Sequence, residues 1–287
     1  MSAVGVESSL NLIEQTLEDI KGLISLPEVY QKIRELMDDP NSDIDQFVAV
    51  VSSDPNLAAT VLKVANSAFF GFPGKIDSIS RAVNMLGLGQ LHDLVLATSA
   101  IVSLDLPNDI MPLRTFWRFS LFSAALTRLL ASQLKIPRGE RLFIIGLLHE
   151  IGHLIMYAKY PQQARLAMAN AQNDQHMLHL SEQNMLGLHY GEIGAKLLAM
   201  WQLPSNFQNI VHYQPTPEIA EEQIVETTLL HVVHGFAQKL IFNNQQPIET
   251  LINPDAWEIL KLTPEQIDGS LETALQACLD MEKLMFS

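Results

Sequence analysis

The sequence predicts an all-α protein, and three features indicate this fold class. Apolar residues recur at spacings of three and four positions along most of the 287 residues, as they do on the buried face of a helix. Alternating apolar and polar residues, the pattern of a strand, are scarce. Residues that start or stop helices interrupt the pattern at short intervals, which predicts short loops throughout.

Residues 1–108 are predicted to form an N-terminal helical lobe. Asp39-Pro40 ends one helix, whereas Asp54-Pro55 has the form of an N-cap followed by proline in the first helical turn. Residues 71–74, with glycine at both ends, predict a turn. Five helices are expected in this lobe, over roughly residues 12–24, 29–37, 55–65, 80–86 and 89–103.

The segment Leu106-Pro107-Asn108-Asp109 is the expected boundary of this lobe. A helical bundle is predicted over residues 109–215, and further helices that pack on it over residues 216–287. Thr263 and Gln266 have the spacing of a capping box, which opens the last helix. The helices are expected over roughly residues 112–134, 140–160, 161–170, 177–186, 190–201, 204–212, 224–241 and 264–285.

Composition and charge exclude several classes of protein. With 48% hydrophobic residues the chain can bury a sizeable core, which excludes a disordered protein. The net charge is −14 and no run of Lys or Arg occurs, so no nucleic-acid partner is expected. Cys278 is the one cysteine, which rules out an internal disulfide. Apolar runs are shorter than the roughly 18–20 residues of a membrane span, and no basic residue precedes Lys21, so we expect a cytoplasmic protein without a membrane partner.

The sequence Gly146-Leu147-Leu148-His149-Glu150-Ile151-Gly152-His153 places three ionisable residues inside an apolar segment that is predicted to be helical. Buried ionisable groups are costly unless they are paired or bind a metal. This segment is therefore the candidate functional site.

One interpretation of this segment is a zinc protease. His149 and His153, four positions apart, would share one helical face, and Glu150 would activate a water molecule. The extended form with a third histidine is absent, and Glu182 is the available carboxylate ligand, although nothing in the sequence marks it. No strand pattern is present that could hold an extended peptide, so we disfavour a protease.

A second interpretation takes His149-Glu150 alone as the active pair. Neighbouring residues on a helix point about 100° apart, so both can reach one metal ion in a groove between helices. The other ligands must then come from later helices. The candidate histidines are His189, His212, His231 and His234.

Several separated motifs resemble, in order, the signature of the HDOD family, a branch of the HD phosphohydrolase superfamily associated with bacterial signalling. They are Leu26-Pro27, Asp54-Pro55-x-Leu57, the segments 62–69 and 79–87, Phe116-Trp117-Arg118-x-Ser120, the segments 146–152 and 194–204, and Ile210-x-His212. The resemblance covers residues 20–240 approximately. It implies an all-helical fold in which an N-terminal helical lobe packs on an HD-like helical bundle, here residues 109–215.

The chain departs from the metal-ligand pattern that this resemblance implies. Phe119 stands where the first histidine of a catalytic HD enzyme is expected, Glu150 replaces the aspartate of the His-Asp pair, and His234 falls at the distal aspartate position. His189 and His212 resemble the extra histidines of binuclear HD enzymes. The resemblance thus implies an altered or vestigial site for Fe, Zn or Mn, with His149, Glu150, His189, His212 and His234 as possible ligands.

From these departures we expect a regulatory signalling module without hydrolytic activity and without catalytic residues. Its partner would be a signalling protein or a small-molecule ligand. The alternative is a metal-dependent phosphohydrolase that acts on a nucleotide or a cyclic dinucleotide with the altered ligand set.

Overall fold

The computed structural model describes residues 28–66, 70, 76–102, 109–137, 139–171 and 175–286. Within these ranges every regular element is a helix and no strand occurs. The predicted helix over residues 12–24 and the predicted turn at residues 71–74 lie outside the described residues. The chain divides into two compact units, and each is described by itself.

Of the described residues, the smaller unit comprises those from 28 to 102 together with 272–286. Its helices form because apolar positions at helical spacing are buried, among them Ile33, Phe47, Val51 and Val61. Leu57 N–H donates to the Asp54 carboxylate at 3.1 Å, as the Asp-Pro pattern predicts. The helices are α2 (Glu28–Asp38), α3 (Ile44–Ser52), α4 (Pro55–Ala65), α5 (Ile79–Leu86) and α6 (Leu88–Val102).

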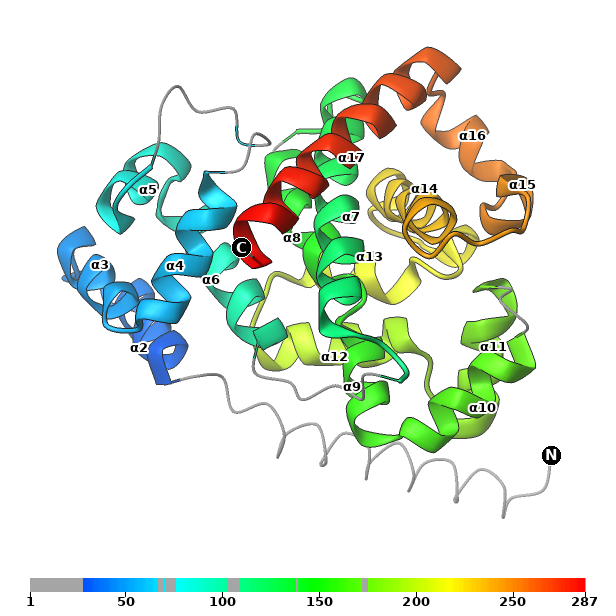
Figure 1. The fold of residues 1–287 in the computed structure, drawn as a ribbon, viewed down its shortest axis with the longest axis horizontal. Coiled ribbons are helices and arrows are strands. Elements are labelled where there is room, and N and C mark those ends of the chain that lie inside the picture. Colours follow the sequence, from blue (N-terminus) through cyan, green and yellow to red (C-terminus); the bar gives the residue numbers. More distant parts are fainter. Residues whose placement is uncertain are drawn as a thin grey trace. The chain divides into compact units, whose positions relative to one another are not determined.

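Of the described residues, the larger unit comprises those from 109 to 271, and it carries every candidate site residue. Its helices, labelled as in Figure 1, are α7 (Leu113–Gln133), α8 (Leu142–Leu148), α9 (Ile151–Lys159), α10 (Pro161–Ala171), α11 (Gln175–Leu186), α12 (Tyr190–Met200), α13 (Ser205–Tyr213), α14 (Ile224–Ile241), α15 (Ile248–Leu251) and α16 (Asp255–Leu260). Two short 3-10 helices, Gly139–Arg141 and Pro217–Ile219, lie between them.

The last helix, α17 (Pro264–Phe286), begins in the larger unit and is assigned to the smaller unit from Glu272 onward. The predicted capping box opens it. Thr263 N–H donates to Gln266 Oε1 at 2.9 Å, and Gln266 N–H donates to Thr263 Oγ1 at 3.3 Å.

Helix α7 forms the centre of the larger unit, where it packs against α8 and α14 (Figure 1). It is buried over most of its length because it carries apolar and small side chains on all its faces, including Phe119, Phe122 and Ala124. Helix α9 packs against α12, and α12 packs against α13. The candidate site lies where α8 ends and α9 begins, next to the middle of α14.

One helical stretch, Leu142–Lys159, is long and apolar enough by composition to cross a membrane. It is 89% buried inside the fold, as is typical of the core helix of a globular protein. A second combination, Ile44–Ser52 with Leu57–Ala65, passes the same test only as a pair that bends by 113°.

Candidate functional site

The segment that carries the histidine motif is two helices and not the single helix that the sequence predicts. Helix α8 ends at Leu148 and α9 starts at Ile151, with His149 and Glu150 in the turn between them. The carbonyl oxygen of His149 accepts a hydrogen bond from Gln214 Nε2 at 2.8 Å. Because a side chain from outside the helix holds this carbonyl, the interruption between the two helices is stabilised.

The structure brings together three of the five residues considered as metal ligands. One ligand atom each from His149, Glu150 and His234 lies within 4.8 Å of the others, and all three residues are buried. His234 comes from the middle of α14. The Glu150 Oε1 atom is 3.2 Å from His234 Nδ1 and 3.9 Å from His149 Nε2.

Four atoms of this cluster are buried without a hydrogen-bond partner among the described residues. They are His149 Nε2, Glu150 Oε1 and both ring nitrogens of His234. The 3.2 Å approach of His234 Nδ1 to Glu150 is an ion-pair distance whose alignment is too poor for a hydrogen bond. Buried polar atoms without partners are rare in folded proteins, and a bound cation would satisfy one atom each of His149, Glu150 and His234.

The protonation of His149 and Glu150 suits cation binding. Burial lowers the pKa of His149 to about 4, so the imidazole is neutral at pH 7. Its Nδ1–H donates to Gly146 O at 2.7 Å, which leaves the lone pair on Nε2 facing the cluster. Burial alone would raise the pKa of Glu150, but His153 and His234 beside it hold that pKa well below its usual range.

His153 is an ion-pair partner and not a metal ligand. Its Nδ1 is 2.5 Å from Glu150 Oε2, and its Nε2 is 2.8 Å from Glu182 Oε1 on α11. Burial would lower its pKa, but the two carboxylates outweigh burial and raise the pKa to about 10. A doubly protonated imidazole has no lone pair for a metal. The zinc-protease interpretation is therefore wrong in two respects, because the helix is interrupted and its second histidine is engaged.

The other two candidate ligands, His189 and His212, lie outside this cluster. The ring centroids of His189 and His212 are 6.1 Å apart, and His179 on α11 packs against His189 at 5.8 Å. His189 is the N-cap of α12, where its Nδ1 accepts from Gly191 N–H at 3.2 Å. Burial, with His179 and His212 nearby, lowers the pKa of His189 to about 3. We therefore describe these residues as a separate histidine cluster.

Phe119 packs directly against both histidines of the cluster. Its ring is stacked on His149 with centroids 5.5 Å apart and an interplanar angle of 17°, and it meets His234 edge-on at 5.7 Å. The ring also stacks on Phe242, with centroids 4.8 Å apart. The aromatic ring thus lies at the position of α7 from which a further imidazole could reach the cluster.

Two residues have supporting roles that the sequence did not indicate. Gln214 holds the backbone of His149, as described above. His231, considered as a possible ligand, donates from Nδ1 to Gln214 O at 2.8 Å and accepts at Nε2 from Asn253 N–H at 2.9 Å. Both nitrogens of His231 are used by the backbone, so it supports the position of Gln214 and is not a ligand.

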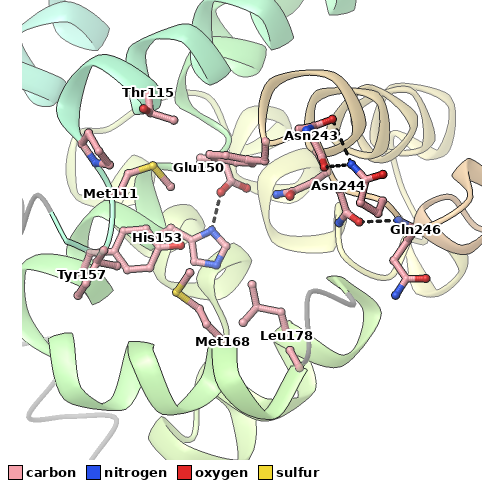
Figure 2. Close-up of a pocket in the computed structure, with 16 residues that line it drawn as sticks. Met111, Thr115, Glu150, His153, Tyr157, Met168, Leu178, Asn243, Asn244 and Gln246 are labelled. Carbon is pink, nitrogen blue, oxygen red and sulfur yellow. Dashed lines mark hydrogen bonds and ion pairs between the residues drawn. The ribbon is translucent and has the colours of Figure 1, made fainter.

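A cavity of about 570 Å³ opens beside the cluster, and Glu150 and His153 line it (Figure 2). Neither His149 nor His234 lines it, so Glu150 is the member of the cluster that faces the cavity. Apolar residues line much of the remainder, including Met111, Tyr157 and Leu178, and carboxamides follow one another along residues 243–246. None of the described lining residues is Lys or Arg.

The residues of the cluster fit a divalent cation. A neutral imidazole, a carboxylate and a second imidazole are ligands that Zn, Fe and Mn accept, and the partnerless atoms converge. Such an ion would be held by His149, Glu150 and His234. When bound, it would polarise an oxygen ligand.

Comparisons with known proteins identify the fold. Residues 23–217 match the family model of the HDOD domain. An uncharacterized protein of Treponema pallidum (strain Nichols) is 27% identical over 216 residues, which are 74% of this chain. The match spans 40% of that relative's length.

Solved structures of similar fold cover almost the whole chain. An HDOD domain protein of unknown function from Geobacter sulfurreducens superposes with a TM-score of 0.75 at 20% identity, over 98% of this chain and 100% of that one. A protein from Shewanella amazonensis SB2B, provisionally named a phosphohydrolase, superposes with a TM-score of 0.73 at 24% identity, over 94% of this chain and 97% of that one. A protein from Marinobacter aquaeolei VT8, provisionally named a signal transduction protein, superposes with a TM-score of 0.71 at 22% identity, over 98% of this chain and 66% of that one. At these identities the likeness shows the fold, and the predicted all-α, HD-like class is confirmed.

Proposed function

The chain belongs to the HDOD domain family, and from this premise we propose that it is a regulatory signalling module without hydrolytic activity. It works by recognising a partner protein or a small ligand, in the cytoplasm of a bacterial cell. The provisional name of the Marinobacter relative, a signal transduction protein, agrees with this role.

The position of Phe119 is the observation that supports this proposal most directly. Its ring lies against His149 and His234, where a further metal ligand would have to enter the cluster. Phenylalanine offers no lone pair, so the cluster has three candidate ligands. In addition, His153 occupies one oxygen of Glu150, which ties part of the ligand set to the protein.

The lining of the cavity supports the same proposal. Phosphoester hydrolysis requires groups that hold the phosphate while charge develops on it, normally Lys, Arg or metal ions. The charged side chains that line the cavity are Glu150 and His153, and they pair with each other. A phosphate in this cavity would meet a carboxylate without a neighbouring Lys or Arg.

Turnover assays test this proposal. We expect the purified protein, supplied in turn with Mn²⁺, Fe²⁺ and Zn²⁺, to leave nucleotides and cyclic dinucleotides unchanged in a chromatographic assay. The matched variant is His149→Ala, which removes a candidate ligand. Metal-dependent turnover that His149→Ala abolishes would reject the proposal.

A metal-dependent phosphohydrolase is the second candidate, and the partnerless atoms of His149, Glu150 and His234 favour it. Three protein ligands also suffice in many catalytic zinc sites. In this case His149, Glu150 and His234 would hold the ion, and the ion would acidify a bound water molecule. His153 would keep Glu150 ionised and oriented.

Metal analysis separates the two candidates. Stoichiometric iron, zinc or manganese in the purified protein would favour the second candidate, and protein that neither contains these metals nor binds them on addition would exclude it. The variant Glu150→Gln serves as the matched control, because it keeps the shape of the side chain and removes the ligand charge.

Replacing Phe119 with histidine should strengthen metal binding. The new imidazole would enter the cluster from α7, beside His149 and His234, and a fourth ligand completes a tetrahedral site. We expect the affinity for Zn²⁺ to rise on the order of tenfold or more, measured by isothermal titration calorimetry. Phe119→Leu, which removes the ring without adding a ligand, is the control. Equal affinities of the two variants would contradict the assignment of Phe119 to the missing ligand position.

A further inference from the structure

One wall of the cavity consists of carboxamides. Gln238 comes from the end of α14, and residues 243–246 of the following loop are Asn, Asn, Gln and Gln. Figure 2 shows Asn243, Asn244 and Gln246 on the side of the cavity away from Tyr157. A carboxamide presents a donor and an acceptor side by side, which matches the edge of a nucleobase, as in the pairing of Asn or Gln with adenine.

Local hydrogen bonds hold the carboxamide loop in place. Gln245 Nε2 donates to Asn243 O at 2.8 Å, and Gln246 N–H donates to Asn244 Oδ1 at 2.9 Å. Asn244 N–H donates to Gln238 O at 3.2 Å, which ties the loop to the end of α14. The wall is therefore preorganised, which lowers the entropy lost when a ligand binds.

Gln238 is the buried member of this wall. The residue is 5% exposed, it lines the cavity, and its side chain makes no hydrogen bond with the residues that the structure describes. Its amide atoms are not among the fully buried unpaired atoms of the described residues, so they are reached from the cavity. A ligand that offers this amide a donor and an acceptor replaces the water there, so Gln238 points to a polar ligand with a defined edge.

Two aromatic rings line the same cavity and are fixed by stacking. Phe242 stacks on Phe119 at 4.8 Å, and Tyr157 stacks on His153 at 5.4 Å with nearly parallel planes. Aromatic rings of this kind bind the flat faces of nucleobases. The combination of rings with carboxamides is typical of base recognition.

The charge of the cavity excludes a phosphate from this ligand. Glu150 and His153 are the charged residues of the lining, His153 is already shared between Glu150 and Glu182, and no Lys or Arg is among the described lining residues. The whole chain carries a net charge of −14. A nucleotide would therefore bring its negative charge into an acidic protein without a compensating cation.

We propose that this cavity binds a nucleoside, that is, a nucleobase carried without phosphate. This inference rests on the proposed function, because it names the small ligand of the regulatory module. The base lies against the aromatic rings and the carboxamide of Gln238 reads its edge. The cavity of about 570 Å³ has the size of a small-ligand site.

Calorimetric titration of the full chain tests the proposal. The probes are adenosine, guanosine, cytidine and uridine, each compared with its 5′-monophosphate. We expect at least one nucleoside to bind. Its monophosphate should bind with an affinity lower by about tenfold or more. Gln238→Leu should weaken nucleoside binding about tenfold, because the edge of the base loses its partner.

Two further variants keep the test decisive. Gln163→Leu, an exposed residue of α10 outside the lining, is the matched control and should bind as the wild type does. Gln246→Ala, at the exposed rim, should weaken binding about threefold even if Gln238→Leu fails to fold.

No nucleoside binding up to about 1 mM, or a monophosphate that binds as tightly as its nucleoside, would overturn the proposal. So would unchanged binding by both cavity variants. Nucleotide turnover in the assays described above would instead reject the regulatory function, so the two failures are distinguishable.

Discussion

The variant Gly152→Ala should lose about 4 kcal/mol or more of unfolding free energy, or fail to fold. Gly152 lies in the first turn of α9, where α9 crosses α12. A Cβ atom at this position would lie 1.9 Å from Tyr190 O and 2.9 Å from Gly194 N. Both are backbone atoms that cannot rotate away, so the two helices would have to separate.

The separation of α9 from α12 would also disturb the candidate site. Tyr190, at the start of α12, stacks on His153 at 4.1 Å, and its N–H donates to Glu182 Oε2 at 3.0 Å. Glu182 is in turn the partner of His153. The close approach at Gly152 therefore holds the ion-pair network in place.

Urea denaturation followed by circular dichroism measures this effect, with Gly269→Ala as the control. Gly269 is also helical and belongs to the larger unit, but a Cβ atom there would meet nothing within 4 Å. Because alanine is a better helix former by about 1 kcal/mol, this control should be as stable as the wild type or slightly more so. A Gly152→Ala protein within about 1 kcal/mol of the wild type would show that the helices do not meet so closely.

The helices could be predicted from the sequence because their signals are local. The helix predicted over residues 112–134 is found as Leu113–Gln133, and that over 224–241 as Ile224–Ile241. Buried periodic residues and caps such as Thr263 act within a few positions of the chain. For this reason the sequence sufficed for the fold class and for most helix bounds.

The details of the site depend on residues far apart in the sequence. The interruption at His149 is held by Gln214, 65 positions away, and the partner of His153 is Glu182, 29 positions away. The pattern gave Glu182 as a carboxylate that could bind zinc, whereas the structure uses it to hold an imidazolium. The grouping of His189 with His179 likewise arises from a contact between the N-cap of α12 and a side chain of α11, which no local spacing indicates.

Replacing His153 with leucine should destabilise the larger unit by about 3–5 kcal/mol. The wild-type imidazolium bridges Glu150 and Glu182, and all three side chains are buried. Leucine fills a similar volume but leaves two buried carboxylates without their cation. Adding Glu182→Gln should recover part of the loss, because the amide oxygen can still accept from Tyr190 N–H.

The pH dependence of this loss identifies its electrostatic origin. The pKa of His153 is about 10 in the folded protein, and about 6.5 is the ordinary value in an unfolded chain. A raised folded pKa stabilises the fold fully below pH 6.5, approximately, and this contribution disappears as the pH rises through about 10. The deficit of His153→Leu should therefore be largest near pH 7. It should shrink toward pH 10, where the wild type loses its proton, and toward pH 5, where a buried carboxylate of the variant gains one. A deficit that is constant from pH 5 to pH 10 would show that His153 contributes through packing and not through charge.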